Sequence, residues 1–271
     1  MWMIKIILGC IPVFAIGYLF LLRGRSGQPM LYKLKGWSYA HRGLHDDTVP
    51  ENSMAAFCRA VEAGYGIELD VHLMADGSLG VIHDSSLMRT AGIDKKIEQL
   101  TAEDLPDCKL EGTEECIPLF ADVLEMVDGK VPLIVEIKTE DGNQNEVTEA
   151  VCAMLKSYHG AYCVESFDPR AIVYVRKHYP DFIRGQLAHN SLKEKSSFSI
   201  LIRFLLTYHL MNFLSIPDFI AYRYCDRKTF SNWLCRKVWR VQGVSWTLTD
   251  QAQFRTAVDE DWIPIFEGFR P

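Results

Sequence analysis

Short apolar segments alternate with helix-forming patterns along most of the chain, and this alternation restricts the possible folds more than any other feature. Each candidate strand is a short run rich in apolar, β-branched or aromatic residues. They are Ser38–Ala40, Ile67–Val71, Leu133–Ile137, Tyr162–Ser166, Ile183–Leu187, Phe219–Tyr222, Val244–Leu248 and Ile263–Phe266. Alternating strands and helices indicate a parallel α/β sheet. Eight strands indicate a closed (β/α)8 TIM barrel, which typically takes about 250 residues. We therefore predict a TIM barrel over residues 36–271.

Two of the helices between these strands have clear starting signals. Asn52 is expected to cap a helix whose apolar stripe includes Met54 and Phe57 and which ends at Gly64. Pro118 is expected to open a second helix, because its fixed φ and missing N–H group suit the first turn.

The N-terminal segment is apolar throughout. Between Lys5 and Arg23 the chain carries no charge, and the stretch 6–22 reaches the lower limit of the roughly 17–25 residues that cross a bilayer. We predict a single-pass transmembrane anchor over residues 1–25 and a linker over residues 26–35. A cleaved signal peptide is the alternative. More basic residues follow the segment than precede it, so the positive-inside rule places the remaining domain in the cytoplasm.

The charge balance excludes one class of partner. The chain has 29 basic and 35 acidic residues and a net charge of −6. No run of five or more basic residues occurs, so we predict no nucleic-acid partner.

Carboxylates lie inside two predicted strands, where a buried charge is costly. Side chains alternate along a strand, so in GIELDVHL the side chains of Glu68 and Asp70 share one face. In VPLIVEIKTE, Glu136 and Lys138 share a face in the same way. Three inward carboxylates require a compensating cation, and oxygen ligands indicate Ca²⁺ or Mg²⁺. The alternative is a buried Glu136–Lys138 ion pair, with Glu68 or Asp70 capping a loop.

Two histidines are predicted to reach the same end of the barrel. The first strand ends in AHRG, where the guanidinium of Arg42 can bind a phosphate. The Asp-Gly pair at 76–77 predicts a hairpin, which would bring His83 beside the carboxylates. His41 and His83 would then form a proton-transfer pair, one accepting a proton from the nucleophile and the other donating one to the leaving alkoxide. A structural role explains either histidine equally well when it is considered alone.

These motifs together resemble a known family. AHRG, PENS, ELDV, the hairpin closing in VIHD, and EIK follow the order and approximate spacing of the glycerophosphodiester phosphodiesterase domain. The resemblance is dense from Tyr39 to Lys138 and thinner to the end of the chain. It implies a TIM barrel with a small insertion over about residues 72–113, and hydrolysis of glycerophosphodiesters to glycerol phosphate and an alcohol. Lysophospholipids are possible further substrates.

The resemblance also assigns roles to individual residues. It implies catalytic roles for His41 and His83, metal binding by Glu68, Asp70 and Glu136, phosphate binding by Arg42 and Lys138, and a substrate-pocket wall formed by Phe167 and Trp246. For His83, metal binding is an alternative role.

Two positions depart from the family pattern. Glu267 occurs where an aspartate is usual, and Glu165 occurs where many relatives have glutamine. Neither is expected to touch the metal or histidine residues. Two other functions remain open: a phosphatidylinositol-type phospholipase C-like phosphodiesterase and a non-enzymatic lipid-binding barrel. The carboxylates argue against a metal-independent phospholipase, and the complete set of polar site residues argues against an inactive barrel.

The segment 198–214 is unusually apolar for a loop region. Its apolar residues occupy nearly every helical face and are interrupted by Arg203 and His209. One interpretation is a helix packed on the barrel. The other is an interfacial helix that contacts membrane lipid beside the pocket.

Overall fold

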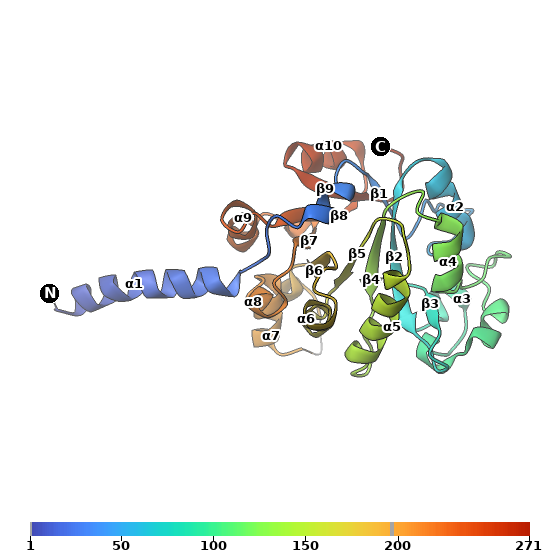
Figure 1. Cartoon of the computed structure of the whole chain (residues 1–271), viewed down its shortest axis with the longest axis horizontal. Coiled ribbons are helices and arrows are strands. Elements are labelled where there is room, and N and C mark those ends of the chain that lie inside the picture. The colour runs from blue at the N-terminus through green and yellow to red at the C-terminus, as the bar shows by residue number, and fades with distance from the viewer. Residues whose placement is uncertain (1, 196–197) are drawn as a thin grey trace.

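The strands form a closed, parallel barrel of eight members. The computed structural model describes residues 2–195 and 198–271, and Figure 1 shows the strands at the centre with helices outside them. The strand order is β1-β9-β8-β7-β6-β5-β4-β2, and β1 also pairs with β2, which closes the barrel. The strands are β1 (Tyr39–His41), β2 (Gly66–Leu73), β4 (Leu133–Ile137), β5 (Tyr162–Ser166), β6 (Arg184–Ala188), β7 (Phe219–Arg223), β8 (Gln242–Leu248) and β9 (Trp262–Phe266). The barrel prediction is confirmed, and each predicted strand lies within two residues of its observed bounds.

Helices follow most of the strands and cover the outside of the barrel (Figure 1). They are α2 (Met54–Glu62), α3 (Met88–Ala91), α4 (Phe120–Val127), α5 (Gln144–Lys156), α6 (Pro169–His178), α7 (Ile200–Thr207), α8 (Asn212–Ser215), α9 (Phe230–Lys237) and α10 (Gln251–Asp259). A further helix, α1 (Trp2–Leu21), precedes the first strand.

Side-chain alternation makes the barrel interior apolar near the amino ends of the strands and charged near their carboxyl ends. On β4 the inward side chain of Ile134 precedes Glu136, and on β5 Cys163 precedes Glu165. Ile134 and Cys163 belong to the core inside the barrel. Residues of opposite parity, such as Leu69, belong to the core between the strands and the helices. The period of two therefore delivers carboxylates to the carboxyl ends of the strands without disrupting the core below them.

A hairpin places the residues that follow β2. Strand β3 (Leu79–Val81) pairs antiparallel with β2, with Val71 opposite Val81. Ile82 N donates to Asp70 O at 3.1 Å, so His83 emerges beside the end of β2 as the Asp-Gly turn predicts. The segment after it has its own small apolar core, which includes Leu87 and Ile97.

The predicted helix starts need small corrections. The cap of α2 is Ser53, whose Oγ accepts from Ala56 N at 3.1 Å. Asn52 has φ 52° and directs its amide into the barrel, where it binds Asp70. The helix after Pro118 begins at Phe120.

The prediction of a transmembrane anchor is wrong. Over the described residues, no helix is both long enough and apolar enough to cross a bilayer. The apolar segment forms α1, which extends away from the barrel (Figure 1), but the end of the segment is buried in the protein. Leu22 packs with Ile220 and Val241, and Trp239 Nε1 donates to Leu19 O at 2.9 Å. The flanking-charge argument for a cytoplasmic domain therefore no longer applies.

One of the basic residues that follow the apolar segment, Arg25, binds an acid at the base of the barrel. Arg25 donates from Nε and Nη2 to the carboxylate of Asp218 at 2.5 and 2.7 Å. It also donates from Nη1 to Pro180 O at 2.7 Å. Arg25 thus neutralises a buried acid, a role that its position after an apolar stretch does not reveal.

Candidate active site

Most of the predicted site residues line one pocket at the carboxyl ends of the strands. Of the nine, seven line this pocket: His41, Arg42, Glu68, His83, Glu136, Phe167 and Trp246. Asp70 and Lys138 are not among the lining residues, but both contact residues that are. This is the end of the barrel where enzymes of this architecture carry their chemistry.

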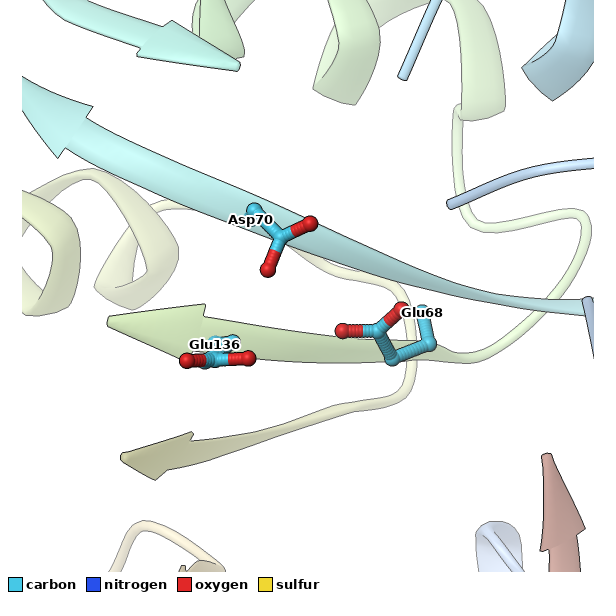
Figure 2. A group of neighbouring side chains, drawn as sticks. All are labelled: Glu68, Asp70 and Glu136. Carbon is cyan, nitrogen blue, oxygen red and sulfur yellow. The ribbon is translucent and has the colours of Figure 1, made fainter. Parts of the chain in front are cut away.

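The three predicted metal ligands form one buried group. Figure 2 shows Glu68 and Asp70 on β2 and Glu136 on the neighbouring strand β4, with their carboxylates facing the space between them. One oxygen from each lies within 4.8 Å of the others. Asp70 and Glu136 are direct partners in the register of β2 and β4, so strand pairing itself brings the two carboxylates together.

Burial and mutual repulsion shift the protonation of this group. Burial, followed by repulsion from Asp70, raises the pKa of Glu68 well above its usual value. Burial also raises the pKa of Glu136, to about 7. For Asp70, burial opposes ionisation, but the charges of Lys138, His83 and Arg42 together outweigh burial and hold the pKa below its usual value. Two of the three carboxylates are therefore poorly compensated as ions, which is the condition that a bound cation relieves.

Glu165 extends the acidic group, contrary to expectation. It is the register partner of Glu136 on β5, and burial, followed by repulsion from Glu136, raises its pKa well above its usual value. Among the described residues, Glu165 Oε2 has no hydrogen-bond partner. With Glu165, four carboxylates face the two cations Arg42 and Lys138, an excess of two negative charges if all ionise. The alternation that reveals Glu136 would also have revealed Glu165.

Cations and an amide hold Asp70 from three directions. Lys138 Nζ lies 2.9 Å from Asp70 Oδ1 and 2.7 Å from Glu136 Oε1. Asn52 Nδ2 donates to Asp70 Oδ2 at 2.8 Å, and Arg42 Nε lies 3.4 Å from the same oxygen. The predicted ion pair of Lys138 with Glu136 is thus present together with the carboxylate group, and the two interpretations do not exclude each other.

The backbone at the end of β1 is shaped to present Arg42. Arg42 and Gly43 both have positive φ, 55° and 81°, so the chain turns sharply after His41. A Cβ on Gly43 would lie 2.9 Å from the backbone of Ala56, which explains the glycine. The turn lets Arg42 N donate to Glu68 Oε2 at 3.1 Å, so the backbone of Arg42 also binds the carboxylate group.

His83 is oriented by a carboxylate and surrounded by cations. Its Nδ1 lies 2.7 Å from Asp84 Oδ1, which leaves Nε2 as the nitrogen without this partner. Arg89 from α3 binds Asp84 Oδ2 at 2.5 Å and holds that carboxylate in place. Burial, followed by the charge of Lys138, lowers the pKa of His83 to about 4.

His41 has its own carboxylate, contributed by the other end of the chain. His41 Nδ1 lies 3.2 Å from Glu267 Oε1, and His45 Nε2 lies 3.0 Å from the same oxygen. His41 Nε2 lies 3.9 Å from Glu68 Oε2. The expectation that Glu267 does not touch the histidines is therefore wrong. Residue 267 reaches His41 because β9 pairs with β1 when the barrel closes.

The opposite wall of the pocket is aromatic and carries residues that sequence reasoning missed. Phe167 lies edge-to-face with Trp246, with ring centroids 5.7 Å apart. His189, Glu194 and Arg223 also line this part of the pocket. His189 and Glu194 follow β6 and Arg223 ends β7; they share no motif, and their only sequence signal is their position after or at a strand end.

Known proteins resemble this chain in sequence. The model of the Glycerophosphoryl diester phosphodiesterase family matches residues 41–219. A glycerophosphodiester phosphodiesterase of Caldanaerobacter subterraneus subsp. tengcongensis is 36% identical over 148 residues, which are 52% of this chain and 58% of that protein. A Rattus norvegicus protein named Lysophospholipase D GDPD1 is 33% identical over 132 residues, which are 44% of this chain and 40% of that protein. The chain thus spans less than two thirds of the length of either relative.

Solved structures resemble the fold. A phosphodiesterase of Oleispira antarctica, in complex with the product sn-glycerol-3-phosphate, matches with a TM-score of 0.69 at 21% identity, over 90% of this chain and 95% of that one. A glycerophosphodiester phosphodiesterase of Thermotoga maritima matches with a TM-score of 0.65 at 24% identity, over 85% of this chain and 93% of that one. At these identities the likeness concerns the fold alone.

Proposed function

The chain belongs to the glycerophosphoryl diester phosphodiesterase family, and on this premise we propose that it hydrolyses glycerophosphodiesters to glycerol phosphate and an alcohol. One observation carries the proposal. Two histidines, each with a carboxylate on Nδ1, line the same pocket as a buried group of carboxylates. A proton acceptor and a proton donor on either side of a phosphate are what phosphodiester hydrolysis requires.

One divalent cation is proposed as the cofactor, held by Glu68, Asp70 and Glu136. Their oxygens suit a hard ion such as Ca²⁺ or Mg²⁺. The raised pKa values of Glu68 and Glu136 support this assignment, because Lys138 and Arg42 leave negative charge uncompensated. When bound, the cation would offset negative charge on the phosphodiester oxygens.

Two cations of the protein are proposed to act on the phosphate. Arg42 lines the pocket, and its guanidinium can donate to the non-bridging oxygens. Lys138 has its ammonium bound to Asp70 and Glu136, so its charge acts on the phosphate from beside these carboxylates. Phe167 and Trp246 would enclose the substrate from the other side.

We assign the base to His83 and the acid to His41. Because its pKa lies near 4, His83 is neutral at pH 7. With Nδ1 facing Asp84, its Nε2 can accept the proton of the attacking water or glycerol 2-hydroxyl. His41 lies between the carboxylates of Glu267 and Glu68. From this position we assign to His41 the protonation of the leaving alkoxide.

Product analysis tests the proposed reaction. Purified protein with glycerophosphocholine or glycerophosphoethanolamine and a divalent cation is expected to release glycerol phosphate and the free alcohol. Enzymatic detection of glycerol 3-phosphate measures the product. Boiled protein supplies the blank. Release of phosphocholine instead would indicate phospholipase C-type cleavage, and no release from any diester would contradict the proposal.

Lysophospholipid is a second candidate substrate, favoured by the surface of α7. Ile200 and Leu201 on this helix are 66% and 64% exposed. The helix lies beside the pocket, because Arg203 donates to the backbone carbonyls of Ser191 and Glu194 and Glu194 lines the pocket. An acyl chain drawn from membrane lipid would find an apolar surface there.

Paired substrates test this role of α7. The double substitution Ile200→Ser and Leu201→Ser is expected to lower activity on lysophosphatidylcholine by about tenfold or more relative to glycerophosphocholine, because apolar contacts with the acyl chain are lost. Choline release from both substrates gives the ratio. Phe230→Ser, which removes an exposed apolar side chain from α9, is the control. Equal losses on both substrates would contradict a contact with the acyl chain.

A further inference from the structure

His72 is a buried histidine that the proposed mechanism does not use. It lies on β2, and the period of two places it on the same face of the strand as Glu68 and Asp70, further toward the carboxyl end. The residue is 3% exposed. A buried imidazole needs hydrogen-bond partners for its ring nitrogens, so the partners of His72 indicate its role.

Both ring nitrogens of His72 face acceptors. Nδ1 lies 2.7 Å from Glu98 Oε1, and Nε2 lies 3.2 Å from the backbone carbonyl oxygen of His83. A carbonyl oxygen can only accept, so Nε2 is the donor in the second contact. His72 therefore connects β2 directly to the backbone of the residue assigned as the base.

Glu98 connects His72 back to the same segment. It lies in the short helix η2 (Ile97–Gln99), and its Oε2 accepts from Ser85 Oγ at 2.7 Å. Burial opposes the ionisation of Glu98, hydrogen bonds from His72 and Ser85 favour it, and the resulting pKa lies below the usual value. The contacts thus form a closed ring through His72, His83, Ser85 and the carboxylate of Glu98.

The segment that carries His83 needs this support, because strand pairing ends before it. Strand β3 ends at Val81. Asp84 orients the imidazole of His83, but Asp84 belongs to the same segment and does not fix that segment relative to β2. The closed ring does so, and β2 carries Glu68 and Asp70. Precise placement matters for a base, since a misplacement of about 1 Å can cost about 100-fold in rate.

We propose that His72 and Glu98 are positioning residues, which hold the backbone of His83 where its imidazole can accept the proton of the nucleophile. This inference rests on the proposed function and extends it, because both residues act through His83 as the base. Neither is assigned a contact with the substrate. Their loss is therefore expected to slow turnover and to leave substrate binding nearly unchanged.

His72→Leu tests the assignment by separating kcat from KM. The substitution removes both hydrogen bonds of the imidazole and is expected to lower kcat on glycerophosphocholine by about tenfold or more, with KM nearly unchanged. Ser85→Ala keeps the buried pair of His72 with Glu98 and removes one hydrogen bond of the ring, so kcat should fall in the same direction. Steady-state kinetics measure both variants. Ser85→Ala serves as the test if melting temperatures show that His72→Leu does not fold.

A double-mutant cycle tests whether His72 acts through His83. Adding His72→Leu to His83→Ala should change kcat by less than about twofold, because the residue that His72 positions is already lost. A purely structural role predicts a further loss as large as that of His72→Leu alone, since the fold is weakened whether or not His83 is present. Such an additive loss would overturn the inference.

The matched control lies in the segment that follows η2. Thr101→Ala removes the hydrogen bond from Thr101 Oγ1 to Asp104 Oδ2, which is 2.7 Å long, at the start of η3 (Ala102–Asp107). It should lower the melting temperature and keep the wild-type kcat.

Three outcomes of these assays would contradict the proposal. A wild-type kcat in both His72→Leu and Ser85→Ala would overturn this inference alone. A loss of kcat in Thr101→Ala equal to that in His72→Leu would do the same. A wild-type enzyme inactive on every diester would overturn the proposed function and this inference together.

Discussion

Replacing His83 with alanine is expected to lower kcat on glycerophosphocholine by at least about 100-fold, the usual lower size of a general-base contribution. His41→Ala should lower kcat by a comparable factor, through loss of the proton donor. The physical reason is shared: each ring has a carboxylate on Nδ1, which leaves Nε2 to exchange a proton in the pocket. Steady-state kinetics of the purified variants measure the factor.

A histidine far from the pocket serves as the control. His159 is 77% exposed and pairs with Asp128, so His159→Ala should keep wild-type kcat. A near-wild-type kcat in either His41→Ala or His83→Ala would remove that histidine from the mechanism. The far-ultraviolet circular dichroism of each variant separates a lost proton transfer from a lost fold.

The pH profile gives these variants a second readout. Burial and the charge of Lys138 lower the pKa of His83 from 6.5 to about 4. Protonation removes the base, and a lowered pKa moves this loss to lower pH. The acid limb of kcat/KM is therefore expected well below pH 6.5, because kcat/KM reports the free enzyme. An acid limb at or above pH 6.5 would contradict His83 as the base.

Chelation of divalent cations is expected to abolish the activity, and added Ca²⁺ or Mg²⁺ should restore it. Without a cation, the buried group has two poorly compensated carboxylates, Glu68 and Glu136, and its negative charge repels a phosphodiester. Asp70→Asn should lower the affinity for the divalent cation and the activity together. The substitution removes one of the three proposed metal ligands and the carboxylate that Arg42 and Lys138 contact. Activity assays in EDTA and elemental analysis of the purified protein measure the two effects.

An exposed acid supplies the matched control for metal binding. Glu125→Gln on α4 removes one carboxylate from the outside of the barrel and should leave both the metal content and the activity unchanged. Full turnover by metal-free protein in excess chelator would contradict the proposed cation. The proposed roles of the two histidines would not be affected by that result.

Features that depend on local periodicity were predictable from the sequence. Alternation along a strand places Glu68 and Asp70 on one face, and the same rule applies to Glu136. The Asp-Gly turn determines which way the next strand runs, and so brings His83 to the end of β2. Each of these inferences needs only neighbouring residues and a period of two. The rule applies equally to Glu165, which shares a face of β5 with Cys163.

Two kinds of feature were not predictable: contacts made when the barrel closes, and the choice between two possible partners of one side chain. Glu267 meets His41 only because β9 closes against β1, and the two residues lie 226 positions apart. The side chain of Asn52 could cap a helix or bind Asp70. In the folded barrel it binds Asp70. The same holds for the pairing of Glu194 with Arg223, which brings together residues that follow β6 and end β7.

The N-terminal segment shows the division most plainly. An apolar helix is predictable from this segment alone, because composition and length are local properties. The position of its end depends on distant parts of the chain. Leu22 packs with Ile220 and Val241, and Arg25 neutralises Asp218 at a separation of 193 positions. Hydrophobicity is a property of one segment, whereas the surface that buries it is assembled from the whole fold. Local patterns therefore predict the barrel and the carboxylates in it, whereas long-range packing supplies the carboxylate of Glu267 to His41 and the surface that buries the end of the N-terminal helix.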